Sequence, residues 1–245
     1  MSKFFYAYVI ISILCITPTI QAQEIEYKSG KQQVALIELY TSQGCSSCPP
    51  ADEWLAQLKN KPGLWDEFVP VAFHVDYWDY LGWKDSFSSA EHSNRQRLHR
   101  KQGNVSVVYT PGFFLNGKEW RSRFGRKIPG LGDPSGELNA MLNNNMLSVR
   151  FEANQVIANT LHVGVLGFGY QTPIQAGENS NRVLHEDFVL LSHTKHKSTN
   201  GTWEVTLPEK VSPRAKKYAL AIWVSNGNNL RPIQTTGGWL PTNLY

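Results

Sequence analysis

Cys45 and Cys48 are the residues of this 245-residue chain best suited to chemistry, because they form a C-x-x-C motif. Two thiols at this spacing can alternate between a dithiol and a disulfide. A cysteine at the start of a helix faces unpaired backbone N–H groups and the positive end of the helix dipole, which lower the thiol pKa from about 8.5 towards neutrality. We therefore expect Cys45, at the exposed turn, to attack a substrate and Cys48, one turn further in, to resolve the mixed disulfide.

The same two cysteines admit two other interpretations. A static structural disulfide would close a very small loop and add little stability. A metal site is the other alternative, because two thiolates together with the imidazole of His74 form a set that suits Cu(I). The redox interpretation needs no cofactor beyond the disulfide itself, and copper enters only in the alternative.

Three ionisable residues on two predicted strands could assist the thiols. Glu38 precedes Cys45 by seven positions; it could accept a proton from Cys48, its pKa raised by desolvation, or be a strand-edge carboxylate that reaches solvent. His74 and Asp76 point the same way from the second strand. We interpret His74 as a general base or ligand, with a hydrogen-bonded buried histidine as the alternative, and Asp76 as a substrate contact.

Aromatic residues gather just after the second predicted strand, at Tyr77, Trp78, Tyr80 and Trp83. Core packing is the expected role for most of them, since aromatic side chains bury large areas. Trp78 and Trp83 are the two that we expect to flank a substrate groove.

The composition indicates an ordinary folded protein. Apolar residues make up 41% of the chain, charged residues 18% and aromatic residues 12%, which excludes disordered, collagen-like and disulfide-rich classes. The formal net charge of +4 at pH 7 is too small to favour nucleic acid as a partner. The expected partners are a protein or small-molecule thiol or disulfide and a separate redox partner.

The first 22 residues predict a secretory signal peptide. Lys3 supplies the positive charge, Phe4–Ile16 is an apolar run, and Ala22 offers a small residue for cleavage. Cleavage would remove Cys15 and leave the C-x-x-C pair in an oxidising compartment. The apolar run is short for a membrane span. We therefore expect a periplasmic or secreted protein with no stable membrane insertion after cleavage, a retained N-terminal anchor being the alternative.

The surrounding sequence predicts the elements that position these residues. Val34–Tyr40 is predicted to be a buried strand, and the C-x-x-C turn enters a helix through Pro49 and Pro50, which suit a first helical turn. A second strand over Val69–Val75 and a helix from about Ser88 to Gly103 follow.

A change of pattern is predicted near residue 147. Before it, Ser135 can cap a further helix with Leu138, Met141 and Leu142 on one side. After it, strand-like runs alternate with Gly, Asn, Pro and Ser clusters, a pattern typical of a β-sandwich.

The order of the first-half segments resembles the thioredoxin fold. A buried strand runs into C-x-x-C at a helix start, a second strand follows, and Val108-Tyr109-Thr110-Pro111 precedes the apolar Phe113-Phe114-Leu115. The resemblance implies that Pro111 is a cis-proline placed against the disulfide. Thr110 and Pro111 would then present a backbone edge to an extended substrate peptide, with Tyr109 and Gly44 as further contacts. Gly44 stands where thioredoxins usually carry Trp, and the direction of electron flow stays open.

The chain is more closely similar to an uncharacterised family of bacterial secreted proteins with a thioredoxin-like N-terminal half. The matching stretches are Glu38–Asp52, His74–Asp85 and Tyr109–Pro111. Because that family has no established biochemical role, the resemblance implies the fold and an exported bacterial setting.

Together these observations predict an α/β thioredoxin-like domain over residues 23–146, a mixed central sheet flanked by helices with a helical insertion around residues 79–103. An all-β sandwich-like domain over residues 147–245 follows. The predicted function is that of an exported thiol-disulfide oxidoreductase. A copper-binding module or carrier is the second hypothesis, and a non-catalytic interaction protein is the third.

Overall fold

Strands make up most of the protein. The computed structural model describes residues 24–121, 127–128, 130–153, 159–242 and 244–245. These residues form fourteen β-strands, two α-helices and two short 3₁₀ helices, Asp79–Leu81 and Leu58–Asn60. The predicted signal peptide, residues 1–22, lies outside the described residues. No helix among the described residues is long and apolar enough to cross a membrane.

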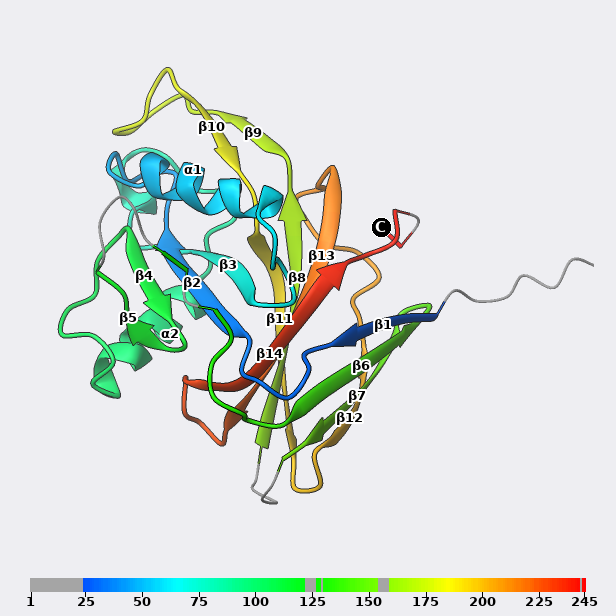
Figure 1. Cartoon of the computed structure of the whole chain (residues 1–245). Helices are drawn as coiled ribbons and strands as arrows, with labels where there is room; N and C mark the ends of the chain where they lie inside the picture. The colour runs from blue at the N-terminus through cyan, green and yellow to red at the C-terminus, as the bar shows by residue number, and fades with distance from the viewer. Residues whose placement is uncertain (1–23, 122–126, 129, 154–158, 243) are drawn as a thin grey trace, which may run out of the picture.

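The largest sheet has eight strands in the order β14-β13-β8-β11-β3-β2-β4-β5 (Figure 1). Apolar residues fill its middle, and every residue of β2 and β3 is buried. Strands β2 and β3 run parallel, with Thr41 beside His74, and β4 is antiparallel to β2. The strand bounds are β2 Ala35–Thr41, β3 Phe68–His74, β4 Gly112–Leu115, β5 Lys118–Glu119, β8 Asn159–Phe168, β11 Val189–Ser198, β13 Lys217–Asn226 and β14 Pro232–Trp239.

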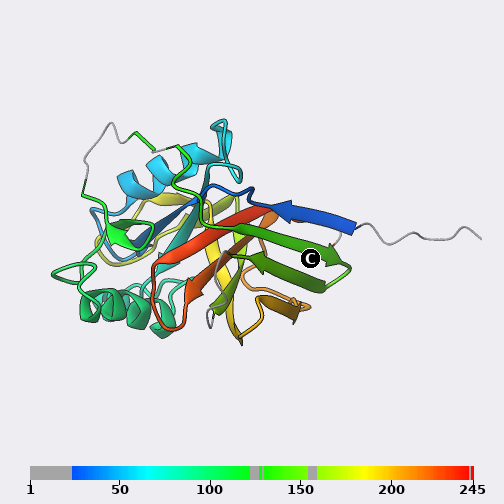
Figure 2. The same cartoon turned by 60° about the horizontal axis from the view of Figure 1, so that its bottom comes forward.

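A four-stranded sheet in the order β1-β6-β7-β12 packs against the β8, β13 and β14 part of the large sheet (Figure 2). Its strands alternate buried and exposed residues, the period expected when one face meets a core and the other meets water. The bounds are β1 Glu24–Lys28, β6 Glu137–Asn143, β7 Met146–Glu152 and β12 Thr202–Thr206. The strands β9 (Tyr170–Pro173) and β10 (Val183–Glu186) form a separate hairpin.

The two helices contact opposite faces of β2 (Figure 2). Helix α1 (Pro49–Gln57) follows β2 directly, and its Asp52 is hydrogen-bonded to Thr41. Helix α2 (Ala90–Lys101) is capped by the Ser89 side chain, and its Arg95 reaches Glu38. Since successive residues of a strand point to opposite faces, Thr41 and Glu38 belong to different sides of the sheet.

The predicted fold class is wrong. Among the described residues, strands predominate and only two α-helices form, so the first half is not an α/β thioredoxin-like domain, and the second half is not a sheet system of its own. The cause lies in strand pairing. Strand β3 pairs with β11 from much later in the chain, so one sheet continues through both halves, and the four-stranded sheet likewise joins β1 and β6 to β7 and β12.

The helix predicted after Ser135 is also wrong, because this segment is strand β6. Leu138, Ala140 and Leu142 are buried and alternate with more exposed neighbours. That is the two-residue period of a strand, and it places these side chains in the core between the two sheets.

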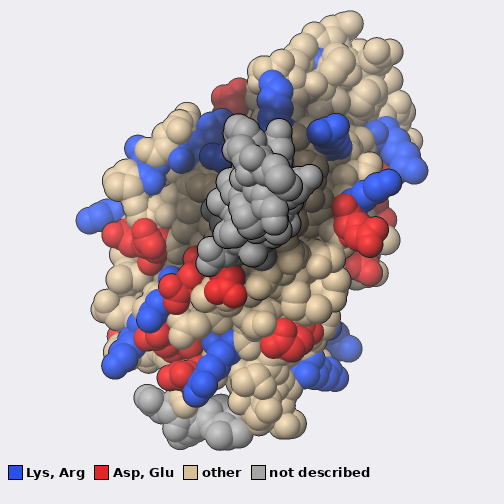
Figure 3. Space-filling view, turned by 90° about the vertical axis from the view of Figure 1, so that its right-hand side faces the viewer, with Lys and Arg blue, Asp and Glu red and all other residues tan. Residues whose placement is uncertain are grey.

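Charged side chains of both signs are spread over the surface. On the face shown in Figure 3, Lys and Arg side chains are interspersed with Asp and Glu side chains. The small positive net charge of +4 is therefore not gathered on this face.

Candidate functional site

Cys45 and Cys48 form a disulfide in the turn between β2 and α1, with their Cα atoms 5.4 Å apart. Helix α1 begins with Pro49 and its N-cap is Cys48. Because proline carries no N–H, the first N–H groups of the helix belong to Ala51 and Asp52, and both donate to the Cys48 carbonyl, at 2.8 and 3.1 Å. The helix therefore influences the cysteines through its dipole, while its first N–H groups are already engaged.

Both cysteines are fully buried, at 0% exposure, although the sequence predicts an exposed turn at Cys45. The neighbouring Ser46 and Ser47 are exposed. The Ser47 hydroxyl lies 3.3 Å from Cys45 Sγ. A disulfide sulfur can only accept, so the hydroxyl donates, and in the reduced protein the same donor would favour a Cys45 thiolate.

A loop of residues 174–182, which joins β9 to β10 and is here called the cover loop, holds the C-x-x-C turn. The fully buried Asn179 donates from Nδ2 to the carbonyls of Gln43, at 2.9 Å, and Cys45, at 3.0 Å. Glu178 Oε2 accepts the Ser46 N–H at 3.0 Å. The backbone around the disulfide is thus fixed by residues more than 130 positions later in the chain.

Buried polar groups lie on the α1 side of the sheet. His74, at the end of β3, is hydrogen-bonded through Nδ1 to Asp85 Oδ2 at 2.7 Å, and Asp85 also accepts the Gln43 N–H at 2.9 Å. Burial lowers the pKa of His74, but Asp85 and the carboxylates of Asp52 and Glu186 outweigh it and raise that pKa to about 9. The imidazole is therefore cationic at neutral pH.

Asp52, in the first turn of α1, lies one helical turn from Cys48. Its Oδ2 accepts the Thr41 hydroxyl at 3.0 Å, and Thr41 is the strand neighbour of His74. Burial raises the pKa of Asp52 to about 7, with the charge of His74 limiting the shift. A carboxyl group with this pKa can take up and return a proton at neutral pH.

Gln43 links the disulfide turn to the β9–β10 hairpin. Its Nε2 donates to Glu186 Oε1 at 2.7 Å and to Thr172 Oγ1 at 3.2 Å. Its Oε1 accepts the indole N–H of Trp83 at 3.0 Å. Trp83 therefore supports the hairpin through Gln43, and Gly177 of the cover loop packs against it.

The Thr110–Pro111 peptide bond is cis and directly precedes β4. Because β4 pairs with β2, this bond lies at the same end of β2 as the disulfide turn. Trp78 spans the two segments. Its indole N–H donates to Thr110 Oγ1 at 2.8 Å, and its Cβ lies 3.0 Å from where a Cβ at Gly44 would stand. The structure thus brings together four predicted site residues, Gly44, Trp78, Thr110 and Pro111.

Glu38 is not brought to the disulfide. It lies on the α2 side of the sheet, where its Oε2 is 2.9 Å from Arg95 Nε, 3.4 Å from His99 Nε2 and 3.0 Å from the Tyr40 hydroxyl. Burial raises the pKa of Glu38, but Arg95 and His99 outweigh it and hold that pKa below its usual range. The alternation of β2 side chains explains the separation, because Thr41 faces Asp52 and Glu38 faces α2.

Asp76 and Tyr109 also contact α2. Asp76 is hydrogen-bonded to Ser93 through its backbone N–H and its carboxylate. The Tyr109 carbonyl accepts from Gln96 at 2.6 Å, and its hydroxyl donates to Glu119 at 2.7 Å. These hydrogen bonds hold Asp76 against α2 and Tyr109 between α2 and β5.

The copper set of Cys45, Cys48 and His74 is not assembled. In the part of the chain that the structure describes, no three His, Cys, Asp or Glu side chains are placed to hold a metal ion. The thiols are joined to each other, and the Nδ1 of His74 is bonded to Asp85.

Several residues of the site were not among those predicted: Gln43, Asp52, Asp85, Glu178, Asn179 and Glu186. Asp52 carries a usable signal, since a carboxylate four positions after the second cysteine lies one turn along the helix. Asn179 and Glu186 carry none, because only the folded chain brings the hairpin to the disulfide.

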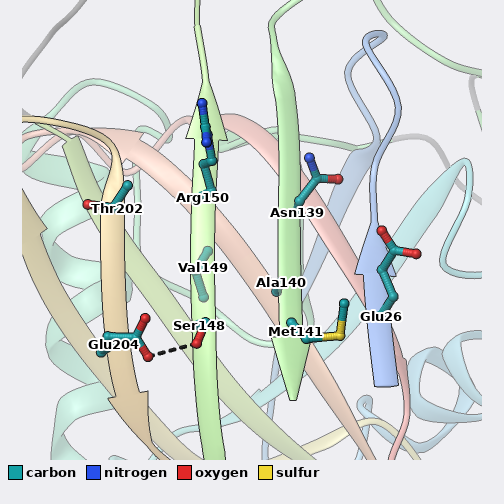
Figure 4. A pocket seen from close by; sticks show the side chains of 9 residues that line it. All are labelled: Glu26, Asn139, Ala140, Met141, Ser148, Val149, Arg150, Thr202 and Glu204. Carbon is teal, nitrogen blue, oxygen red and sulfur yellow. Dashed lines mark hydrogen bonds between the residues drawn. The ribbon is translucent and has the colours of Figure 1, made fainter. Parts of the chain in front are cut away.

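A shallow hollow of about 280 Å³ lies on the outer face of the four-stranded sheet (Figure 4). Ser148 on β7 donates to Glu204 on β12 at 2.8 Å across it. The residues that line it are Glu26, Asn139, Ala140, Met141, Ser148, Val149, Arg150, Thr202 and Glu204. Among these described residues there is no predicted site residue, so the disulfide region is the stronger candidate.

Comparisons with known proteins concern fold and family. No curated protein matches the chain. A solved structure from Agrobacterium tumefaciens is 23% identical, with a TM-score of 0.63, over 86% of this chain and 96% of that chain. The structure of HBP35 of Porphyromonas gingivalis is 13% identical, with a TM-score of 0.55, over 88% of this chain and 79% of that chain.

These two likenesses, at such low identity, are likenesses of fold alone. A family model gives the classification, since it matches residues 36–225. The chain belongs to the family described as "Protein of unknown function (DUF1223)".

Proposed function

We propose that this protein is an exported thiol-disulfide oxidoreductase that uses Cys45 and Cys48 on a protein or small-molecule thiol or disulfide. The observation that carries the proposal is the pairing of a C-x-x-C disulfide with Asp52, a half-buried residue one turn away whose carboxyl pKa is raised by desolvation to about 7. The cis Thr110–Pro111 bond at the same end of β2 supports it. This local arrangement, as distinct from the whole fold, resembles the site of thioredoxin-like oxidoreductases.

The reaction starts from the dithiol form when a disulfide is to be reduced. The Cys45 thiolate attacks one sulfur of the substrate disulfide, a bond forms between Cys45 and that sulfur, and the other substrate sulfur leaves as a thiolate. Cys48 then gives its proton to Asp52 and attacks Cys45 Sγ. The second substrate sulfur leaves and takes the proton from Asp52. Two electrons pass to the substrate, and Cys45–Cys48 is oxidised to the disulfide; the reverse sequence oxidises a substrate dithiol.

His74 acts as a positioning residue for this proton transfer. Its positive charge limits the rise in the pKa of Asp52, so that the carboxylate can form at neutral pH. Asp85 fixes the imidazole through the 2.7 Å bond to Nδ1. Trp78 holds Thr110 in place, and the partly exposed Thr110 and Pro111 supply the edge along which an extended substrate lies.

Access to the sulfur atoms requires the cover loop to move. Both cysteines are fully buried beneath it, whereas thiol–disulfide exchange needs a linear approach to one of the sulfurs. The proposed reaction cycle therefore begins with displacement of residues 174–182.

The test is catalysed reduction of insulin disulfides by the protein, with dithiothreitol as the electron donor. The wild type should accelerate the reaction, Cys45→Ser should run at the uncatalysed rate, and Cys48→Ser should accumulate a mixed disulfide detectable by mass spectrometry. Glu53→Gln, which changes an exposed residue of α1, serves as the matched control and should retain the activity. Equal rates for the wild type and Cys45→Ser would reject the proposal.

A further inference from the structure

A polar cavity lies between helix α2 and strand β11, on the face of the large sheet opposite to helix α1. Its volume is about 390 Å³, within the range of small-molecule sites. Four of the lining residues follow the i, i+3, i+4, i+7 spacing of one helix face, so a single side of α2 forms one wall. The lining residues are Glu91, Asn94, Arg95 and Leu98 of α2, His193 and Lys195 of β11, and Leu230 between β13 and β14.

Two opposite charges enter this cavity from its two walls. Glu91, in the first turn of α2, supplies the negative charge, and Lys195 on β11 supplies the positive charge. Both side chains are exposed, and neither forms a hydrogen bond or an ion pair with another described residue. Partial burial and the charge of Arg95 lower the pKa of Lys195, whereas the charge of Glu91 raises it. The two groups therefore act on each other across the cavity, while each stays free to bind a ligand.

Arg95 belongs to the floor of the cavity, where its guanidinium is already engaged. It is 4% exposed, and its Nε donates to Glu38 Oε2 at 2.9 Å. Glu38 thus balances the charge of Arg95 inside the protein. Among the described lining residues, the accessible charges are then one negative and one positive. A ligand with one charge of each sign matches this pair, whereas a simple anion or cation would be attracted by one group and repelled by the other.

The order of side chains along α2 indicates how such a ligand would lie. Asn94 follows Glu91 by about one turn. Its Oδ1 accepts from Arg97 Nη1 at 2.8 Å, which fixes the amide and leaves Nδ2 as a donor for an anionic group. Leu98 follows one turn later and forms an apolar wall with Leu230. At 1.5 Å per residue, Glu91 and Leu98 lie about 10 Å apart along the helix axis, a span suited to a small molecule with an apolar end.

The walls of the cavity are fixed by hydrogen bonds and ring stacking. Gln102, which ends α2, donates from Nε2 to the Asn228 carbonyl at 2.9 Å and accepts the Leu230 N–H at 3.1 Å. The His193 ring is stacked on Trp223, with centroids 5.1 Å apart. The helix, the strand and the loop that carries Leu230 are therefore held in place, and a ligand need not order them.

We propose that this cavity binds a free α-amino acid with an aliphatic side chain. The ligand's ammonium donates to the Glu91 carboxylate, and its carboxylate accepts from Lys195 Nζ and Asn94 Nδ2. Its side chain contacts Leu98 and Leu230. The site is separate from the disulfide chemistry, because α2 and α1 contact opposite faces of β2.

Calorimetric titration of the full chain with L-leucine tests the proposal. Leucine should bind, whereas leucinamide, which lacks the carboxylate, and N-acetyl-leucine, which lacks the ammonium, should each bind at least about tenfold more weakly. Glycine, which lacks the apolar side chain, should also bind at least about tenfold more weakly. Absence of leucine binding, or equal affinity for leucine and any one of these three compounds, would overturn the assignment of the ligand.

Two variants that remove a charge test which wall holds which group. Lys195→Gln should weaken leucine binding about tenfold and should not weaken that of leucinamide, which has no carboxylate to lose a partner. Glu91→Gln should weaken leucine binding about tenfold and should not weaken that of N-acetyl-leucine, which has no ammonium.

The matched controls are exposed residues outside the cavity lining, Lys197→Gln on β11 and Glu53→Gln on α1. Both should bind leucine as the wild type does. If Lys195→Gln binds leucine as tightly as Lys197→Gln, or Glu91→Gln as tightly as Glu53→Gln, the cavity is not the binding site.

Discussion

Asp52 is the single residue whose surroundings best match proton transfer at the disulfide. Burial and the nearby His74 set its pKa at about 7, so both protonation states are populated near neutral pH. Its backbone N–H is bonded to the Cys48 carbonyl at 3.1 Å, which fixes the carboxyl-bearing turn against the resolving cysteine. A base with this pKa both takes a proton readily and gives it back.

We predict that Asp52→Asn slows insulin reduction by at least about 100-fold, the usual contribution of a general base. The carboxylate is the active form, so the wild-type kcat/KM should rise with pH through an inflection near 7. The asparagine variant should lack that inflection, and the pH profile of kcat/KM measures it. Glu53→Gln, an exposed neighbour on α1, should keep the wild-type profile. An unchanged inflection in Asp52→Asn would assign the proton transfer to another group.

At the scale of secondary-structure elements, the β9–β10 hairpin is the part able to open. It pairs only within itself among the described strands, and its hold on the disulfide turn depends on side chains, chiefly Asn179 and Glu186. Displacing it therefore breaks no hydrogen bond of the eight-stranded sheet. Segments attached in this way open at a lower free energy than the core does.

Asn179→Ala should expose the disulfide. The change removes two hydrogen bonds to the backbone of Gln43 and Cys45, so we expect glutathione to reduce Cys45–Cys48 about tenfold faster than in the wild type. Thiol trapping followed by mass spectrometry measures this rate without any assay of catalysis. Ser180→Ala is the matched control, because this hydroxyl bonds within the loop to the Gln175 carbonyl. If the two variants react at the same rate, the loop does not protect the disulfide through Asn179.

Local sequence patterns predicted the elements closest to the disulfide. The predicted strand Val34–Tyr40 differs by one residue at each end from β2, Ala35–Thr41, because a run of apolar residues followed by a C-x-x-C and two prolines leaves few alternatives. The prediction of a helix after Ser135 was wrong because the segment fits both patterns. Leu138, Met141 and Leu142 fit one face of a helix, whereas Leu138, Ala140 and Leu142 fit one face of a strand. Burial against the second sheet decides between the two periods.

Long-range pairing was beyond such patterns. The contact of β3 with β11 joins Ala72 to Val189, and no feature of either segment specifies the other. For the same reason the site could be predicted only in part. The cysteines and the Thr110–Pro111 segment stand out in the sequence, whereas the bond between Asn179 and Cys45 depends on where the hairpin comes to rest.

At the scale of the whole molecule, buried histidines make the free energy of unfolding fall at acid pH. Burial lowers the pKa of His92 to about 4, and it also lowers the pKa of His99, His162 and His193. Each binds a proton more readily in the unfolded chain, where its pKa is about 6.5. Their contribution to stability is therefore present above pH 6.5 and lost as the pH falls below it. Asp52 and Glu186, whose pKa values are raised by burial, act in the opposite sense, but as two carboxyls against four imidazoles.

His74 makes the free energy of unfolding fall at alkaline pH. This decrease is the alkaline limb of the stability curve, and the decrease caused by the four histidines is its acid limb. Its folded pKa of about 9 lies above the unfolded value of 6.5, so its contribution is complete below pH 6.5 and is lost as the pH rises through 9. The shift corresponds to at most about 3 kcal/mol.

Denaturant unfolding between pH 5 and 9, with the disulfide intact, should therefore give a free energy of unfolding that is greatest near pH 6.5 to 7. His74→Gln should lower that maximum and flatten the alkaline limb while keeping the acid limb. His185→Gln, a change at an exposed histidine of β10, should leave both limbs as they are, and an alkaline limb that survives in His74→Gln would show that another group loses its proton there.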